Sequence, residues 1–339
     1  MGQQPAARAA VMSDVARLAG VSHQTVSRVL NNHPSVRQET RERVMRAVHQ
    51  LNYRPNALAR GLAGRRSRVI GVVSFDTILY GPAATLLGIE RAARAAGYGI
   101  SIVTLERLDR AGVRSAIDAL TAQSVAGVVL IAPMLTAAVA VHGLPTGVPA
   151  VVVESGDAGD LPSISVDQAA GARLAVEHLL ALGHETVWHI GGPRDWLEAR
   201  DRVDGWRSAL EAAGRPVPPV LTGDWSPRAG YEIGQSLADR PDVTAVFCAN
   251  DHQALGLLRS LHQRGVRVPE DVSVVGFDDI PEAEYLSPPL TTVRQDFDEV
   301  GRRCVATLLE LFGEPAGHTT EPQVEPTLVV RASSGGRKA

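Results

Sequence analysis

Cysteine, aromatic residues and long apolar runs are all scarce in this chain of 339 residues. Its two cysteines, Cys248 and Cys304, provide neither a disulfide framework nor the ligand spacing of a zinc site. No apolar run approaches the roughly 18 residues that a membrane-spanning helix needs. Near the N-terminus, Arg8, Asp14 and Arg17 interrupt any apolar segment of a secretory signal. These absences argue against a disulfide-stabilised secreted scaffold and a helical membrane protein, and we expect a cytoplasmic globular chain.

The sequence motifs of common enzyme classes are also missing. The chain contains no G-x-S-x-G, H-E-x-x-H or P-loop string, and Gly191-Gly192-Pro193 lacks the spacing of a dinucleotide-binding loop. Its ten histidines are too scattered for a metal site. We therefore expect neither an enzyme nor a bound metal or cofactor. At roughly 150 residues per domain, the length predicts two or three folded units.

Charge is distributed unevenly along the chain, although the formal net charge is only −3. Residues 1–68 carry twelve arginines against three acidic residues, a formal charge of +9, whereas the remaining residues carry −12. A basic block attached to an acidic body is typical of a chain in which one small domain binds nucleic acid.

Three short amphipathic helices are predicted within the basic block. Ser13 is a candidate N-cap for the first helix, and Gly20 suits a left-handed turn at its end. Ser22 is a candidate N-cap for a second helix over residues 23–30, and a third helix is expected roughly over residues 37–51. Two helices joined by a four-residue turn, the second with a polar outer face, form a helix-turn-helix.

The outer face of the second helix carries side chains that suit DNA. Arg28 can donate two hydrogen bonds to guanine, and Gln24 can contact an adenine edge. His23 and Ser27 share this face at 3.6 residues per turn. A solvated helical bundle is the alternative, and the charge of +9 argues against it. The side chains that suit phosphate contacts, which set register without specifying bases, are Ser22, Thr25, Asn31 and Arg41.

The strings SDVARLAGVSHQTVSRVLNN and LNYRPNALARGLAG resemble the N-terminal region of the LacI/GalR family of bacterial transcriptional repressors, and the resemblance continues to about Arg331. It implies an all-α, lambda-repressor-like helix-turn-helix domain over residues 11–55 and a hinge over residues 56–68. In the hinge, Asn56 is expected to cap a short helix, and Leu62 to enter the minor groove as a wedge that bends DNA. About two helical turns are unstable alone, so we expect this helix to form only when two copies pack on DNA.

Seven short apolar runs alternate with helical stretches in the rest of the chain. This alternation predicts parallel strands covered on both faces. The family resemblance implies an α/β effector domain of the periplasmic-binding-protein type over residues 69–331. Its two parallel-sheet subdomains are expected at about 69–166 with 295–324 and about 167–294 with 325–331. The predicted strands occupy residues 69–75, 98–103, 126–132, 149–154, 186–191, 243–248 and 272–277.

Ligands of such folds bind beyond the carboxyl ends of the strands, between the subdomains. Polar side chains there can bind the hydroxyls of a sugar, while an aromatic ring covers its apolar face. The resemblance implies Arg200, Asn250 and Asp278 as hydroxyl partners. It also implies an apolar wall, and other candidates lie near strand ends or in the string PPLTTVRQDF. The wall residues are Leu79, Pro82, Trp225 and Phe297, and the other candidates are Asp76, Glu154 and Gln295.

Four positions depart from the pattern that the resemblance implies. In the expected pocket, Phe75, Ile131 and Glu154 replace a serine, an asparagine and an aspartate, which leaves the ligand open. On the second helix His23 replaces a tyrosine, which leaves the DNA sequence open.

The sequence thus predicts a homodimeric repressor that binds a near-palindromic operator, because twofold symmetry places two recognition helices in successive major grooves. A small sugar, such as a galactoside or related glycoside, is expected to release it allosterically. One alternative is a purine-responsive repressor of the same family, with Phe75, Trp225 and Phe297 around a base. The other is a secreted solute-binding protein, against which the basic N-terminal block argues. We expect the repressor to associate with the nucleoid when bound to its operator.

Overall fold

A computed structural model describes residues 10–30, 33–53, 67–75, 78–105, 109–133, 148–153, 161–315 and 321–336. Its contacts divide the chain into two units, Met1–Ser67 and Arg68–Ala339. Five of the predicted site residues lie outside the described residues, so their roles stay predictions. They are Asn31, Asn56, Leu62, Asp76 and Glu154.

The first unit contains the three predicted helices, α1 (Met12–Ala19), α2 (His23–Leu30) and α3 (Gln38–Gln50). Each helix turns an apolar stripe toward the other two, as its 3.6-residue periodicity requires. The buried centre of this small core is formed by Val15, Ala16, Ala19, Val26, Val29, Val44, Ala47 and Tyr53.

Two of the three caps predicted for α1 and α2 are confirmed. Gly20 has a φ of 62° and ends α1, and the Thr25 N–H donates to Ser22 Oγ at 3.2 Å at the start of α2. The prediction that Ser13 caps α1 is wrong. The helix begins at Met12 with Val11 as its N-cap, two residues earlier than predicted, and the Asp14 carboxylate in its first turn accepts the Val11 N–H at 3.1 Å. An acidic side chain thus satisfies the helix start in place of the serine.

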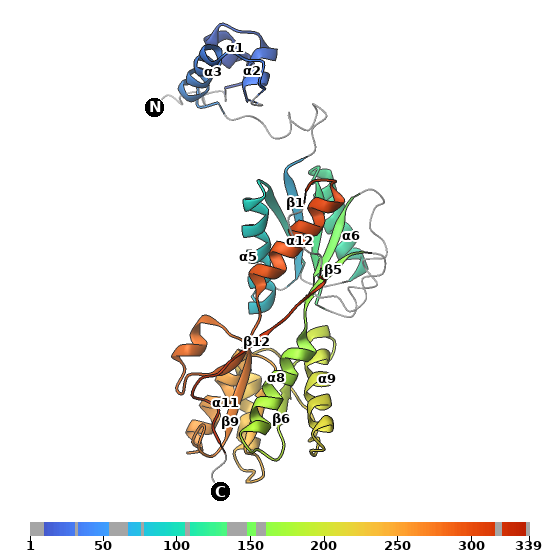
Figure 1. Cartoon of the computed structure of the whole chain (residues 1–339), viewed down its shortest axis with the longest axis vertical. Coiled ribbons are helices and arrows are strands. Elements are labelled where there is room, and N and C mark those ends of the chain that lie inside the picture. The colour runs from blue at the N-terminus through green and yellow to red at the C-terminus, as the bar shows by residue number, and fades with distance from the viewer. Residues whose placement is uncertain are drawn as a thin grey trace, which may run out of the picture. The chain divides into compact units, whose positions relative to one another are not determined.

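The second unit contains two six-stranded sheets (Figure 1). The strands of the first sheet are β1 (Val69–Phe75), β2 (Gly99–Leu105), β3 (Gly127–Ile131), β4 (Ala150–Val153), β5 (Ser163–Val166) and β11 (Gln323–Val324). Their order across the sheet is β11-β5-β4-β3-β1-β2, and every neighbouring pair is parallel.

The second sheet has the same kind of order, β12-β10-β9-β8-β6-β7, with one antiparallel pair where β12 joins β10. Its other neighbouring strands are parallel. The strands are β6 (Trp188–Gly191), β7 (Leu221–Thr222), β8 (Ala245–Cys248), β9 (Ser273–Asp278), β10 (Thr291–Arg294) and β12 (Thr327–Val329).

Helices cover both faces of each sheet. Around the first sheet pack α5 (Tyr80–Ala95) and α12 (Phe297–Leu311) on one core, and α6 (Arg110–Ala122) on the other. A short 3₁₀ helix, η1 (Pro281–Tyr285), follows β9. Around the second sheet, α8 and α9 share one core, and α10 and α11 share the other. These helices are α8 (Gln168–Ala181), α9 (Leu197–Ala212), α10 (Pro227–Leu237) and α11 (Asp251–Gln263).

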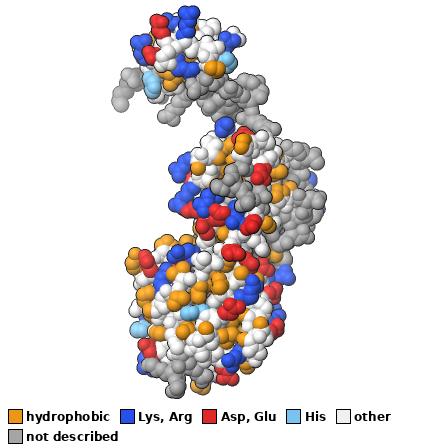
Figure 2. All heavy atoms as spheres, viewed as in Figure 1, with side chains coloured by type: hydrophobic (Ala, Val, Ile, Leu, Met, Phe, Trp, Pro, Cys, Tyr) orange, Lys and Arg blue, Asp and Glu red, His pale blue; other side chains and the backbone are white. Residues whose placement is uncertain are grey.

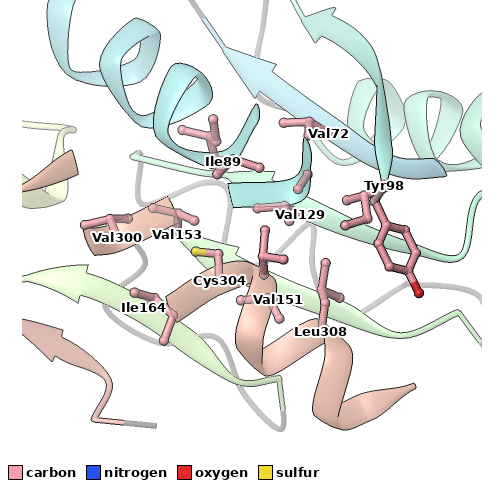
Figure 3. Packing of buried hydrophobic residues seen from close by; sticks show 14 of the residues in the cluster. Val72, Ile89, Tyr98, Val129, Val151, Val153, Ile164, Val300, Cys304 and Leu308 are labelled. Atoms are coloured by element: carbon pink, nitrogen blue, oxygen red, sulfur yellow. The ribbon is translucent and has the colours of Figure 1, made fainter. Parts of the chain in front are cut away.

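Figure 3 shows the core that α12 closes over the first sheet. Val72, Val129 and Val151 come from three neighbouring strands, and Cys304 and Leu308 come from α12. All five are buried, which accounts for the continuous β-branched runs in the sequence.

Two glycines set the spacing between α5 and α12. A Cβ on Gly301 would collide with the backbone of Gly88, and a Cβ on Gly88 would collide with the backbone of Phe297. The two helices therefore approach more closely than any larger residue allows. None of the described helices is long and apolar enough to cross a membrane.

The chain passes between the two sheets three times, between β5 and α8, between β10 and α12, and between β11 and β12. Each sheet is thus assembled from distant parts of the sequence. The three crossings position the residues that lie between the two halves of the unit.

Candidate functional site

The outer face of α2 presents an exposed polar surface in the first unit. His23, Gln24 and Arg28 are exposed, whereas Val26 and Val29 on the inner face belong to the core. Ser27 is half-buried. Arginine side chains are spread over the surface of this unit (Figure 2), and those exposed are Arg17, Arg28, Arg37, Arg43 and Arg46.

The side chains predicted to contact phosphates also hold the unit together. Arg41 on α3 donates from Nη2 to the His33 carbonyl at 3.0 Å and from Nη1 to the Val29 carbonyl at 3.4 Å. The hydroxyls of Ser22 and Thr25 lie 2.9 Å apart at the start of α2. Arg41 therefore links α3 to the end of α2, and its contact with phosphate stays a prediction.

A cavity of about 270 Å³ lies between the two halves of the second unit. It brings together most of the residues predicted for ligand binding, although they come from distant parts of the sequence. The predicted residues in its lining are Leu79, Pro82, Ile131, Trp225, Asn250, Asp278, Gln295 and Phe297. Further residues of the lining include Tyr80, Thr85, Gln168, Trp196, Glu198, Arg202 and His252.

Four buried polar side chains form a closed ring in the cavity wall. Arg202 Nε donates to Gln168 Oε1 at 2.9 Å, and Gln168 Nε2 donates to Gln295 Oε1 at 2.9 Å. Gln295 Nε2 donates to Asp278 Oδ1 at 2.8 Å, and Arg202 Nη2 lies 3.8 Å from the same oxygen. Gln168 lies at the end of one crossing between the sheets and Gln295 at the beginning of another, so the ring connects the cavity with the segments that join its halves.

Asp278 is the acidic member of this ring and ends β9. Burial raises its pKa to about 6, while Arg202 and the hydrogen bond from Gln295 partly oppose that rise. Its backbone φ is 112°, a region that non-glycine residues rarely adopt. Such strain is often found where a side chain is held for a ligand.

The prediction that Arg200 lies in this cavity is wrong. Arg200 is exposed and lines a separate groove, whereas Arg202, only 4% exposed, lines the cavity. Besides its ring contacts, Arg202 donates to the Ala249 carbonyl and lies 3.9 Å above the Phe277 ring. Helix periodicity explains the difference, because Arg202 shares the buried face of α9 with Trp206.

Trp225 forms part of the apolar wall and is fixed from several sides. A Cβ on Gly192 would collide with its ring, and the Trp196 ring meets it edge-on at 5.4 Å. Asn250 Nδ2 donates to the Trp225 carbonyl at 3.1 Å, while Asn250 Oδ1 accepts the Gln253 N–H and caps α11. Asn250 thus positions Trp225 as well as lining the cavity.

Phe75 does not line the cavity, contrary to the prediction. Its ring packs against Trp196 at 6.3 Å, and Trp196 occupies the cavity wall instead. Phe297 does line the cavity and meets Tyr80 edge-on at 5.9 Å. The two halves also meet directly, because the Leu197 N–H donates to the Pro133 carbonyl at 2.9 Å.

Several residues of the lining were missed from the sequence, among them Gln168, Trp196, Glu198 and Arg202. Glu198 and Arg202 lie four residues apart on one face of α9, so the 3.6-residue helix period could have identified them. Gln168 follows β5, a short strand without an apolar run, and gave no such signal. Within the described residues, no three His, Cys, Asp or Glu side chains form a possible metal site.

Fold and sites together define a protein class, in which a helix-turn-helix unit is joined to a two-sheet ligand-binding unit. Residues 11–56 match the family "Bacterial regulatory proteins, lacI family", and residues 176–334 match a periplasmic binding protein-like domain. The chain is 38% identical to the lactose operon repressor of Escherichia coli (strain K12) over 302 residues, which are 88% of this chain and 83% of that repressor. The chain therefore belongs to the lacI family of DNA-binding transcriptional repressors.

Two further relatives support the family and the fold. The HTH-type transcriptional repressor PurR of Haemophilus influenzae (strain ATCC 51907 / DSM 11121 / KW20 / Rd) is 33% identical over 331 residues, 96% of this chain and 98% of that protein. A crystal structure of the Lac repressor dimer bound to operator and the anti-inducer ONPF matches with a TM-score of 0.88 and 36% identity. That match covers 97% of this chain and all of the other. The expected family and fold class are confirmed.

Proposed function

We propose that this repressor binds a near-palindromic operator as a homodimer and that a small sugar, a galactoside or related glycoside, releases it. The similarity to the lactose operon repressor, and to the Lac repressor dimer bound to operator, supports operator DNA and a second copy of the chain as partners. We place the protein in the cytoplasm, associated with the nucleoid when bound to operator.

One observation supports a sugar more than any other, namely that the cavity wall combines a cluster of polar side chains with aromatic rings. Arg202, Asp278 and Gln295 present charged or amide groups on one part. Trp225 and Phe297 present aromatic rings on another. A pyranose offers hydroxyls at its edge and C–H groups on its face, so it matches both parts at once.

A purine effector is the alternative, because PurR of Haemophilus influenzae is among the relatives. Stacking of a base between Phe75, Trp225 and Phe297 would support it. Phe75, however, is outside the lining, and Ile131 and Pro82 occupy the wall with Phe297. The cavity therefore supports the sugar better than the base.

The proposed function is tested with the full chain in two assays. A thermal-shift panel of galactosides, other glycosides, nucleobases and sugar phosphates identifies the effector class. A gel shift on operator from the neighbouring intergenic DNA then measures release. We expect a glycoside to raise the Tm and to dissociate the complex. A response to nucleobases alone would show that the effector is a purine rather than a sugar. Absence of specific DNA binding would contradict the proposed repressor function.

Asp278→Ala tests the assignment of the cavity. A charge-assisted hydrogen bond contributes roughly 1.5–3 kcal/mol, so effector binding is expected to weaken about ten- to a hundredfold. Asp278→Asn keeps the shape of the side chain and is the control for misfolding. Operator binding without effector is expected to stay close to that of the wild type. Release at the wild-type effector concentration in both variants would contradict the assignment.

The hinge is tested separately. We propose that Leu62 wedges into the minor groove beside a helix capped by Asn56. Leu62→Ala is expected to reduce DNA bending and operator affinity while effector affinity stays unchanged. Circular-permutation gel shifts measure the bend, and an unchanged bend would contradict the wedge.

A further inference from the structure

A second groove, of about 560 Å³, lies along α9 and the edge strand β7. Arg200 and Arg207 line it from α9, and Arg194 lines it from the turn before that helix. Asp204 is its one acidic side chain, and Thr222 of β7 adds a hydroxyl. The groove therefore carries three guanidinium groups and one carboxylate.

The three arginines differ from most exposed arginines of this unit. Arg194, Arg200 and Arg207 are exposed, and in the part of the chain that the structure describes none of them forms an ion pair. Several other exposed arginines of this unit do pair with a carboxylate, as Arg240 does with Asp242 at 2.9 Å. The three guanidinium groups outnumber the neighbouring carboxylates, which are Asp204 in the lining and Asp201 beside Arg200. The remaining positive charge favours binding of an anion.

Helix α9 separates this groove from the effector cavity. Glu198 and Arg202 line the cavity, whereas Arg200, Asp204 and Arg207 line the groove. The latter three recur at intervals of four and three residues, the spacing of a single helix face. The groove is thus a separate site built on a helix that also serves the cavity.

We propose that this groove binds a phosphorylated small molecule, with its phosphoryl group held by Arg194, Arg200 and Arg207. A guanidinium group matches phosphate with two parallel hydrogen bonds and stays charged at every physiological pH. The volume lies within the range of ligand pockets, roughly 300–1,000 Å³. The residues after residue 68 carry a formal charge of −12, so a local excess of positive charge stands out against its surroundings.

Isothermal titration of the full chain at about 0.15 M salt, where long-range attraction is screened, tests the proposal. The probes are glucose 6-phosphate, glucose and inorganic phosphate. We expect glucose 6-phosphate to bind the wild type. Affinity is expected to fall at least tenfold in the double variant Arg200→Gln/Arg207→Gln and to rise in Asp204→Asn. Inorganic phosphate binding as tightly as the sugar phosphate would identify the free anion as the ligand.

Arg114→Gln is the matched control, because Arg114 is also exposed but lies on α6 beside the other sheet. The affinity of this variant for glucose 6-phosphate is expected to equal that of the wild type. Such a result would show that the loss in the double variant does not come from the change in overall charge. Binding that is absent in the wild type, or equal in the double variant and the wild type, would overturn the proposal. Release from operator by an uncharged glycoside and loss of glucose 6-phosphate binding in the groove variants are separate measurements, so the two proposals fail independently.

Discussion

The helical unit and the α/β unit hold their candidate functional side chains in opposite ways. On α2, His23, Gln24 and Arg28 are exposed, while separate residues of the same helix form the core. In the cavity, Arg202 and Asp278 are 4% and 6% exposed and bonded within a ring of polar side chains. A surface that binds the major groove of DNA needs protruding side chains, whereas a cavity that encloses a small ligand needs buried side chains.

This difference predicts how function and stability are related in each unit. An exposed side chain can be replaced with little change in the free energy of unfolding, since it keeps its hydration. A buried charge loses its partners when one member of the network is removed. Mutations in the cavity should therefore change stability together with ligand binding, and mutations on the face of α2 should change DNA binding alone. The predictions below test this contrast from the largest expected effect on stability to the smallest.

The largest effect is expected from Arg202→Leu. It leaves Asp278 buried without its cation, and removing one partner of a buried pair costs about 3–5 kcal/mol. Arg200→Leu is the matched control, because Arg200 lies two residues away on α9 but is exposed. We expect Arg200→Leu to change the free energy of unfolding by less than about 0.5 kcal/mol. Urea unfolding measures both, and equal losses would contradict the buried pair.

The second effect concerns pH and Asp278. Its pKa is about 6 in the folded chain, against an ordinary value of 3.8. The folded state therefore holds a proton between about pH 4 and 6 that the unfolded state releases. The contribution of Asp278 to stability is therefore fully present below this window and is lost, by an amount on the order of 3 kcal/mol, as pH rises through it.

Asp278→Asn removes this titration and is the variant that measures it. As pH rises from 4 to 7, the unfolding free energy of the wild type should fall relative to that of the variant. Burial also raises the pKa of Asp251, and Asp278 adds to that rise, so the difference includes the relief of this repulsion. A difference that is independent of pH would show that Asp278 is ionised throughout.

The strands illustrate how much of the fold the sequence predicted. The seven apolar runs became β1, β2, β3, β4, β6, β8 and β9. Six of these strands are largely buried, and a strand covered on both faces must be apolar throughout, whereas the edge strand β2 is only partly buried. The strands β5, β7, β10, β11 and β12 were missed. They have two to four residues each and include polar ones such as Ser163, Thr222 and Thr327. Only their position in the assembled sheet makes them strands.

The two arginines of α9 show where prediction of the site failed. The family resemblance implies an arginine in this segment and predicts Arg200, whereas Arg202 is the one that shares the buried face of α9 with Ala199 and Trp206. The helix period would have decided between them. Gln168 is different, because its place in the ring depends on a crossing between sheets that no local pattern encodes.

The third effect tests an exception to the contrast within the helical unit. Arg41 donates to the carbonyls of Val29 and His33, so Arg41→Ala is expected to lower the stability of this unit by about 1 kcal/mol. Arg43→Ala removes an exposed arginine from the same helix and is the control. Thermal unfolding followed by circular dichroism of the full chain measures both. If Arg41 serves only as a phosphate contact, the two variants will melt alike and both will weaken binding to any DNA.

The smallest effect on stability, combined with a large effect on DNA binding, is expected from Arg28→Ala. Arg28 is exposed on the outer face of α2, so its loss should change the unfolding free energy by less than about 0.5 kcal/mol. Loss of two hydrogen bonds to a guanine should weaken operator binding by about 1–3 kcal/mol per half-site, while binding to random DNA falls only slightly. Arg28→Lys keeps the charge but lacks the planar fork, so it should lose specificity and retain non-specific binding. Competition gel shifts with operator and random duplexes measure both affinities. If Arg28→Ala weakens the two equally, Arg28 contacts phosphate rather than a base, and the contrast between the units would rest on other residues of α2.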